Sequence, residues 1–357
     1  MPQYTLVDRP EKINTHLGTH DPIGVDTEFM REKTYFAQLC LVQISTTAGC
    51  YCVDPLVDDD LSAFWEVVTG KTWIVHSGRQ DIEVIYQTAQ RMPARLFDTQ
   101  IAAGLLGHMP QLGYADLVNE FFDVELAKSH TRADWTRRPL PDAVLQYAAE
   151  DVEYLLPAFD MLTESLDKMG RLAWAEEDSA LLLDPALYDT DPKLAIARLK
   201  GARNMHGRSH AAAARLAAWR ENEALRANRP RQWIVKDRVL LEIAARQPSQ
   251  ASELARIDGL PPGLLRRAGD DLLAVIRASA ADDDSYRPPN RPDESQKALL
   301  KEMLSKVAEC AADLGLAAET IAPRKELSAV ILSGHRDSRV FSGWRRALIG
   351  EQLIELL

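Results

Sequence analysis

Long apolar segments are missing from this chain of 357 residues. No run of about 18 consecutive apolar residues occurs, which is the length that a helix needs to cross a bilayer. The N-terminal segment MPQYTLVDRPEKI also lacks the basic stretch followed by an apolar one that marks a secretory signal. We therefore expect a cytoplasmic protein with no membrane partner.

Cysteine is scarce as well. The four cysteines are Cys40, Cys50, Cys52 and Cys310, and their spacing matches neither a zinc-ligand ladder nor a disulfide-rich secreted scaffold. We expect reduced thiols. The rest of the composition, with 46% hydrophobic and 27% charged residues, is ordinary for a globular protein, and the length predicts two or three domains.

Positive charge is in short supply and unevenly placed. The net charge is −11, but residues 206–357 carry 24 Lys or Arg and 21 Asp or Glu, a net charge of +3. Residues 1–205 carry 18 and 32 and so have a net charge of −14. This acidic part would repel a nucleic acid unless local basic residues or metal ions intervene.

Carboxylates stand out among what the chain does contain. The segment Pro22 to Glu28 has the pattern of a short apolar strand, in which residues two apart share a face. Asp26 and Glu28 therefore point the same way. Clustered carboxylates repel one another and are costly to gather unless a cation holds them, so this pair predicts a metal site.

Two further segments add to this pair. Asp81, in HSGRQD, opens a helical pattern directly after the strand-like TWIVHSG, which predicts a position at the carboxyl end of the sheet. Tyr147 and Asp151, in YAAED, lie four positions apart on a helix predicted over residues 142–160, so they share a face. Oxygen ligands alone favour Mg²⁺ or Mn²⁺ over zinc. Two such ions, about 3.5–4 Å apart, would serve phosphoryl transfer.

The segments DTE, HSGRQD and YAAED together resemble the three exonuclease motifs of the DEDD superfamily, in its tyrosine subclass. Within that superfamily the chain is similar to the ribonuclease D family, also in TYFAQLCLVQIS, FDTQIAAGLLG and DWTRRPLP. The resemblance implies a ribonuclease H-like fold and cleavage from the 3′ end that releases nucleoside 5′-monophosphates. It further implies two metal ions held by Asp26, Glu28, Asp81 and Asp151. In this arrangement Asp26 bridges the two ions and Asp81 binds the second one. Tyr147 aligns the attacking water.

Each of these residues has a plainer interpretation when it is taken singly. Asp81 alone would be a helix N-cap, and Tyr147 alone would be a core or surface aromatic residue. Their joint occurrence favours the metal site. Asp98, in LFDTQ, stays outside it as a cap or turn former, and His76 is expected to be a structural residue with its hydrogen bonds satisfied.

Coarse patterning places an α/β exonuclease domain, a mixed sheet flanked by helices, over residues 1–205. Behind it, residues 206–284 resemble an HRDC helical module, through the segment NRPRQWIVKDRVLLEIA among others. Residues 285–293 have the composition of a linker. Residues 294–357 are all-helical in pattern, and we expect a second HRDC-like domain there, with a generic helical cap as the alternative.

Basic and aromatic residues suggest where RNA would bind. A group of basic and aromatic residues lies just before the third motif and comprises Lys128, Arg132, Trp135, Arg137 and Arg138. These side chains could line a channel for a single strand; the alternative is a surface loop with a buried tryptophan. In the first helical module the candidates for phosphate contacts are Arg220, Arg229, Arg231 and Lys236, against the alternative of a solvated helix face. Trp344, Arg345 and Arg346 invite the same interpretation in the last unit.

The acidic cluster together with the family resemblance predicts a metal-dependent 3′–5′ exoribonuclease that trims single-stranded 3′ tails from structured RNA. The resemblance suggests tRNA precursors as substrates, and no obligate protein partner is inferred. Two alternatives stay open: a DNA-directed 3′–5′ exonuclease on the same fold, and an inactive RNA-binding scaffold. The retained acidic set argues against the scaffold, whereas discrimination between RNA and DNA rests on 2′-hydroxyl contacts that sequence does not reveal.

Overall fold

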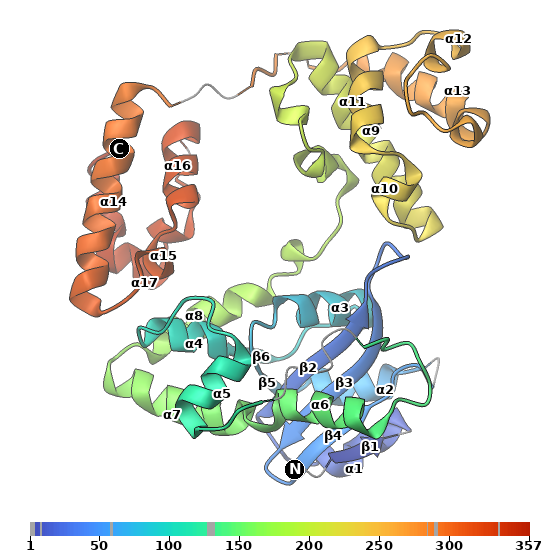
Figure 1. Ribbon diagram of the computed structural model, residues 1–357. Coiled ribbons are helices and arrows are strands. Elements are labelled where there is room, and N and C mark those ends of the chain that lie inside the picture. Colours follow the sequence, from blue (N-terminus) through green and yellow to red (C-terminus); the bar gives the residue numbers. More distant parts are fainter. Residues whose placement is uncertain are drawn as a thin grey trace. The chain divides into compact units, whose positions relative to one another are not determined.

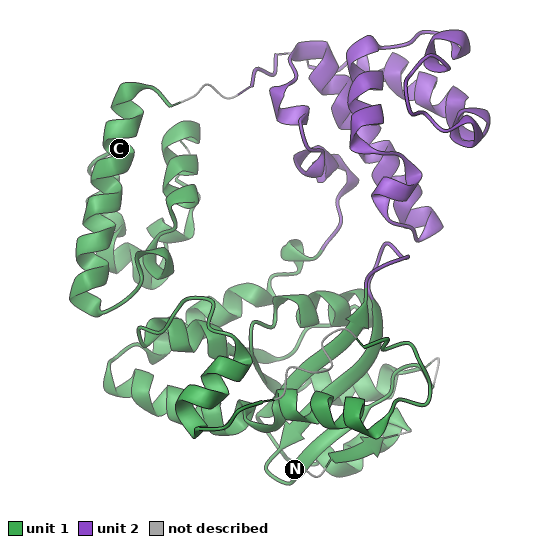
Figure 2. Ribbon diagram, viewed as in Figure 1, with its two compact units in different colours: residues 1–30, 38–188, 292–357 green, residues 31–37, 189–291 purple. Residues whose placement is uncertain are grey.

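The structure is a computed structural model that describes residues 4–7, 9–57, 60–126, 133–283, 285–288, 292–334 and 336–357. The chain forms two compact units, shown in Figure 2. Unit 1 comprises residues 1–30, 38–188 and 292–357, and unit 2 comprises residues 31–37 and 189–291. The loop at residues 31–37 thus groups with unit 2, although it connects two strands of unit 1.

A mixed sheet of six strands forms the centre of unit 1 (Figure 1), as the patterning predicts. The strands are β1 (Tyr4–Val7), β2 (Ile23–Met30), β3 (Gln38–Thr46), β4 (Gly49–Val53), β5 (Thr72–Val75) and β6 (Arg95–Asp98), in the spatial order β1-β4-β3-β2-β5-β6. The pairs β2–β3 and β3–β4 are antiparallel, and the other pairs are parallel. β2 therefore lies inside the sheet with a neighbour on both sides.

Helices cover this sheet. They are α1 (Ile13–Leu17), α2 (Ser62–Thr69), α3 (Arg79–Ala89), α4 (Thr99–Leu105), α5 (Tyr114–Phe122), α6 (Asp142–Glu153), α7 (Leu155–Lys168) and α8 (Leu172–Ala180). α6 packs on β2, β3 and β4, and its buried residues include Leu145, Ala148 and Val152. Since their spacing repeats every three or four residues, one stripe of α6 faces the sheet.

The helix predicted over residues 142–160 is two helices in the structure. α6 ends at Glu153 and α7 begins at Leu155. Pro157 explains the break, because proline has no backbone N–H and its ring clashes with the carbonyl four residues earlier, here that of Glu153. At the boundary between the two helices, the backbone N–H of Tyr154 donates to the Tyr114 hydroxyl, 3.0 Å away. Proline thus sets where the helix carrying Tyr147 and Asp151 ends.

Unit 2 is helical. Its α-helices are α9 (Gly207–Ala227), α10 (Arg231–Ile234), α11 (Asp237–Arg246), α12 (Ala251–Leu254) and α13 (Pro262–Ser279), preceded by 3₁₀ turns that include Pro192–Arg198. Its core is rich in alanine and leucine, for example Ala213, Leu216 and Ala217 on α9, which allow close helix packing. The backbone N–H of Tyr35, from the loop at residues 31–37, donates to the Asn228 side chain at 3.0 Å and so fastens that loop to α9.

The last helices of the chain share the core of unit 1. They are α14 (Glu294–Leu314), α15 (Ala318–Ile321), α16 (Arg324–Ser333), α17 (Gly343–Arg345) and α18 (Glu351–Ile354). Trp344 stacks on Trp174 of α8 with ring centroids 4.5 Å apart. Arg345, 2% exposed, forms a buried ion pair with Asp178 of α8. Removing one partner of such a pair leaves an uncompensated buried charge, which costs about 3–5 kcal/mol.

Two features of the composition can be compared with the structure. Among the described residues, no helix combines the length and apolar character needed to span a membrane. Cys40, Cys50, Cys52 and Cys310 are free cysteines, as predicted. Burial raises the pKa of the Cys52 thiol to about 12, so this thiol stays protonated and unreactive at neutral pH.

Candidate active site

The site begins with the alternation of β2. Asp26 and Glu28 lie two residues apart on this strand and share one of its faces, whereas Thr27 between them points to the other face. Asp26 is paired with Gln43 of β3, and a bulge follows Glu28. The placement predicted for the two carboxylates is confirmed.

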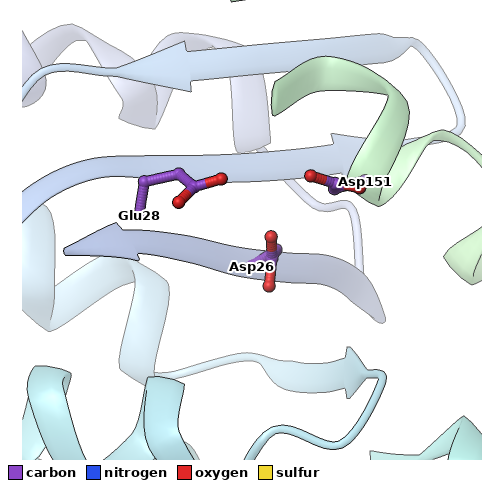
Figure 3. A group of neighbouring side chains, drawn as sticks. All are labelled: Asp26, Glu28 and Asp151. Atoms are coloured by element: carbon purple, nitrogen blue, oxygen red, sulfur yellow. The ribbon is translucent and has the colours of Figure 1, made fainter. Parts of the chain in front are cut away.

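Asp151 completes a group of three carboxylates (Figure 3). It comes from α6, which packs over the face of β2 that carries Asp26 and Glu28. One carboxylate oxygen from each of the three residues lies within 4.8 Å of the other two. Figure 3 shows Glu28 and Asp151 extending toward the space beside Asp26. Segments more than a hundred residues apart in the chain therefore meet at one point of the sheet.

Asp81 lies outside this group of three. It sits in the first turn of α3, as predicted, and is 8% exposed. Its Oδ1 atom accepts hydrogen bonds from the Thr27 backbone N–H at 3.2 Å and from the Thr27 hydroxyl at 2.5 Å. Asp81 is nonetheless close enough to Asp26 that its charge, after burial, is the next largest cause of the raised Asp26 pKa. It therefore borders the site from the Thr27 side.

The pKa values of the site carboxylates are raised, because these groups are buried and lie close to one another. Burial raises the pKa of Glu28 to about 8, and the charges of Asp151 and Asp81 add to the rise. Burial also raises the pKa of Asp151 to about 7 and that of Asp81 to about 6. The pKa of Asp26 is raised well above its ordinary value by burial and by its three acidic neighbours. Without a cation, the cluster therefore retains protons on some of its carboxylates at neutral pH.

Tyr147 lies on the same face of α6 as Asp151, as its spacing predicts. Its hydroxyl hydrogen-bonds to the Asp151 carboxylate, and this bond lowers the Asp151 pKa against the effect of burial. Burial and the nearby carboxylates raise the Tyr147 pKa, so the phenol keeps its proton at neutral pH and acts as a donor. Its ring packs near that of Trp135, with centroids 6.5 Å apart.

The two residues left outside the predicted site are structural, as expected. Asp98 is the N-cap of α4, where its side chain accepts from the Gln100 backbone N–H at 2.9 Å. Its carboxylate also accepts from the backbone N–H groups of Ser77 and Gly78. His76 is satisfied by the Thr99 hydroxyl at 2.9 Å and by the Leu112 carbonyl at 2.8 Å.

Two residues near the carboxylates were not predicted from the sequence. Thr27 fixes Asp81 through two hydrogen bonds, and only its orientation away from Asp26 follows from strand alternation. Tyr114 is partly buried beside the site, donates to the Glu150 carbonyl at 3.3 Å and accepts from the backbone N–H of Tyr154. No local pattern signals its role, because its partners lie 36 and 40 residues away in the chain.

The structure corrects part of the predicted RNA-binding group before the third motif. Trp135 is 2% exposed, which is the buried-tryptophan alternative, so its ring offers no surface for a base. Arg138 is engaged by the Asp54 carboxylate at 2.7 Å and by the Cys40 and Trp135 carbonyls, both at 2.7 Å. These two residues hold the segment against the core. Lys128 and Arg132 lie outside the described residues.

The basic residues of the helical regions divide in the same way. Arg220 is 3% exposed and bonds to Asp237 at 2.6 Å and to the Val235 carbonyl at 3.1 Å, so it is structural and not a phosphate contact. Trp344 and Arg345 are buried, which likewise corrects their assignment to an RNA surface. The basic candidates that reach solvent are Arg229, Arg231, Lys236, Arg137 and Arg346.

The donor set fits a divalent cation. Three carboxylates within 4.8 Å offer only oxygen ligands, which hard ions such as Mg²⁺ and Mn²⁺ prefer. Their raised pKa values show a charge excess that a cation would neutralise. Carboxylates gathered in this way on a mixed α/β sheet are typical of metal-dependent hydrolases, among them nucleases.

Comparison with known proteins identifies the family. A family model described as a 3′-5′ exonuclease matches residues 5–167, and the HRDC domain model matches residues 209–276. Ribonuclease D of Acidiphilium cryptum is 36% identical over 369 residues, covering 99% of this chain and 93% of the relative. Ribonuclease D of Gluconacetobacter diazotrophicus is 35% identical over 345 residues, covering 94% of this chain and 87% of the relative.

Among solved structures, the chain is similar to Escherichia coli RNase D, described as an exoribonuclease involved in structured RNA processing. The TM-score is 0.90 with 27% sequence identity, and the match covers 99% of this chain and 98% of that one. The chain therefore belongs to the ribonuclease D family of 3′–5′ exoribonucleases. The exonuclease fold and the HRDC domain predicted from the sequence are confirmed.

Metal binding should release protons and strengthen as the pH rises. Because the pKa values of Glu28 and Asp151 are raised to about 8 and about 7, Glu28 is mostly protonated and Asp151 about half protonated at pH 7, and a cation must displace these protons. The apparent Mg²⁺ affinity of the chelator-treated protein is expected to increase from pH 6 to pH 8.5. Isothermal titration calorimetry in buffers of different ionisation enthalpy measures both the affinity and the protons released.

The same shifts fix the sign of the stability effect. A carboxyl group whose pKa is higher in the folded than in the unfolded protein stabilises the metal-free fold at low pH. For Glu28 this contribution is complete when the pH is below about 4.5, the pKa of glutamate in the unfolded chain, and it is lost as the pH rises through about 8. Mg²⁺ should therefore stabilise the protein more at pH 8.5 than at pH 6. An Mg²⁺ affinity that stays flat across this range, with no proton release, would contradict the assignment.

Proposed function

We propose that this protein removes nucleotides one at a time from the single-stranded 3′ ends of structured RNA, tRNA precursors among them, and releases nucleoside 5′-monophosphates. The gathered carboxylates of Asp26, Glu28 and Asp151 carry this proposal. Support for RNA as the substrate comes from the ribonuclease D relatives, whose identity extends over both the exonuclease and HRDC regions. We also propose the domain boundaries expected from the sequence: an exonuclease domain over residues 1–205, an HRDC domain over 206–284, a linker over 285–293 and a second HRDC-like domain over 294–357.

The residues would divide the work of an in-line displacement at phosphorus. Two bound Mg²⁺ or Mn²⁺ ions would activate a water on one side and stabilise the leaving oxygen on the other. Asp26 would bridge the ions, Glu28 and Asp151 would complete the ligation, and Asp81 would hold the second ion. Tyr147 would align the attacking water, which suits a phenol that stays protonated beside Asp151.

Asp81 differs from the other ligands in this scheme. Its Oδ1 atom already accepts two hydrogen bonds from Thr27, so Oδ2 is the oxygen that suits the second ion. The bonds to Thr27 would hold the carboxylate in one orientation, which reduces the entropy lost on metal binding. Thr27 would thus be a positioning residue within the motif DTE.

A time course on a 5′-labelled hairpin RNA with a 3′ tail tests the function. With Mg²⁺ or Mn²⁺ the tail should shorten stepwise and stop near the stem, and a chelator should abolish the reaction. Asp151→Asn should lower turnover by orders of magnitude, because it removes an anionic ligand. Asp142→Asn, an exposed carboxylate at the start of the same helix, is the matched control and should react like the parent.

Two outcomes of this assay would contradict the proposal. If the parent binds the RNA but leaves it intact in every metal condition, the scaffold alternative gains support. If a matched DNA tail is shortened faster than the RNA tail, the DNA-directed alternative replaces the main proposal. Equal turnover by Asp151→Asn and Asp142→Asn would remove Asp151 from the site.

RNA backbone contacts are proposed for unit 2, around a hollow of about 390 Å³. Its lining includes Arg198, Lys200 and Arg231. Arg198 and Arg231 both reach the carboxylate of Glu221, at 2.9 and 3.4 Å, and Glu221 is 1% exposed. One buried negative charge thus faces two arginines, which leaves positive charge at the surface for phosphate. Arg229 and Lys236 are exposed and extend the proposed contacts.

Salt dependence tests the hollow. In the Asp26→Asn background, which keeps the RNA intact, Lys200→Ala should weaken binding of the tailed hairpin. The slope of log affinity against log salt concentration should become shallower by about 0.7, the value for one lost phosphate contact on a single strand. Lys193→Ala, an exposed lysine on the preceding 3₁₀ turn (Pro192–Arg198) and outside the hollow, is the control. Identical slopes for both variants would rule out Lys200 as a contact.

A further inference from the structure

Gln43 is a polar side chain in the middle of β3 that has no hydrogen-bond partner among the described residues. It is 0% exposed, and neither amide atom, Nε2 or Oε1, is paired. Leaving a buried amide unpaired costs free energy, because the group has given up its hydrogen bonds to water. A core position of this kind is better filled by leucine or methionine unless the amide has a partner in another state of the protein.

The register of the sheet shows which group could be that partner. Gln43 lies opposite Asp26 on β2 and opposite Cys52 on β4. Directly opposed residues of antiparallel strands point to the same face, with Cβ atoms about 4.5–5.5 Å apart. The Cys52 thiol is already directed to the Leu145 carbonyl at 3.8 Å, and sulfur is a weak acceptor. Asp26 is therefore the carboxylate directly opposite Gln43, and it is a strong acceptor for an amide N–H.

A carboxylate that binds a metal ion is generally also held by a hydrogen-bond donor such as an amide N–H. A carboxylate offers about four lone-pair positions, and a cation uses only those that face it. The remaining positions of ligating carboxylates are generally hydrogen-bonded, and these bonds set the orientation of the ligand. Asp26 lies on an inner strand with β3 on one side, and α6 packs on both of these strands.

We propose that Gln43 is a positioning residue for the metal site: its Nε2 amide donates a hydrogen bond to the Asp26 carboxylate when Asp26 holds a divalent cation. The bond would hold Asp26 in the orientation that binds the ion. This inference rests on the proposed metal-binding role of Asp26. It explains why an amide that is unpaired in the protein alone occupies the core position opposite that residue.

Ser45 provides a matched control on the same strand and face. It is 3% exposed, and its Oγ atom also has no partner among the described residues. Ser45 lies opposite Gly24 and Cys50, neither of which is a carboxylate. A Cβ atom at Gly24 would meet the Ser45 Oγ at 2.2 Å, so this hydroxyl occupies the space above glycine. Ser45→Ala therefore removes a buried, unpaired polar atom without touching Asp26.

The test compares Gln43→Leu with Ser45→Ala in the full-length protein. Mg²⁺ and Mn²⁺ affinities are measured by isothermal titration calorimetry without RNA, and thermal unfolding is measured with a chelator present. Gln43→Leu is expected to weaken metal binding roughly 10- to 100-fold, the usual effect of losing a partner of a ligand. Its unfolding temperature without metal should be no lower than that of the parent, because two unpaired polar atoms are replaced by apolar ones.

The two variants should separate metal affinity from stability. Ser45→Ala should share the unchanged or raised unfolding temperature but bind metal like the parent. In the RNA-shortening assay, the lower kcat of Gln43→Leu should recover at high Mg²⁺ concentration, as expected when a weakened metal site is refilled. A structural role for Gln43 would instead give a loss that excess metal does not restore.

Several results would overturn the inference. Equal metal affinity in Gln43→Leu and the parent would do so, as would an equal loss in Ser45→Ala. If Gln43→Leu does not fold, Gln43→Met replaces it with a flexible side chain of similar length, and failure of both to fold would show that the amide supports the metal-free core. Metal affinity is measured without RNA, so the comparison still tests the role of Gln43 if the protein proves not to trim RNA.

Discussion

The repulsion among Asp26, Glu28 and Asp151 is the constraint on which the rest of the site depends. Three carboxylate oxygens within 4.8 Å of one another are unfavourable when ionised, and their raised pKa values show that the protein alone meets this by holding protons. In the proposed function, divalent cations would replace those protons with charge that can also bind phosphate oxygens. We therefore propose that the acidic cluster binds metal and substrate together.

The surrounding elements hold the cluster in place from three directions. β2 presents two carboxylates on one face, α6 brings Asp151 over that face, and α3 adds Asp81 from the side of Thr27. The break between α6 and α7 at Tyr154 and the hydrogen bond to Tyr114 fix where α6 ends. Catalysis by positioned ions tolerates little movement of their ligands, so a site on regular strands and helices suits it better than one on loops.

Sequence reasoning succeeded where a short-range period sets the geometry. Strand alternation oriented Asp26 and Glu28, helical spacing paired Tyr147 with Asp151, and the strand-to-helix boundary located Asp81. It failed where packing between distant segments decides: Trp135 is buried, Arg138 is held by Asp54, and the hydrogen bonds of Asp81 go to a residue 54 positions away. Composition does not show which aromatic or basic side chains become buried, because burial depends on which distant segments pack together.

The most direct test of the account is to locate the ions themselves. Crystals grown with a nucleoside 5′-monophosphate and soaked in Mn²⁺ would be measured near the manganese absorption edge. The account predicts two anomalous peaks about 3.5–4 Å apart, with Asp26 in contact with both. Strong manganese peaks elsewhere in the protein, with none among Asp26, Glu28 and Asp151, would contradict it.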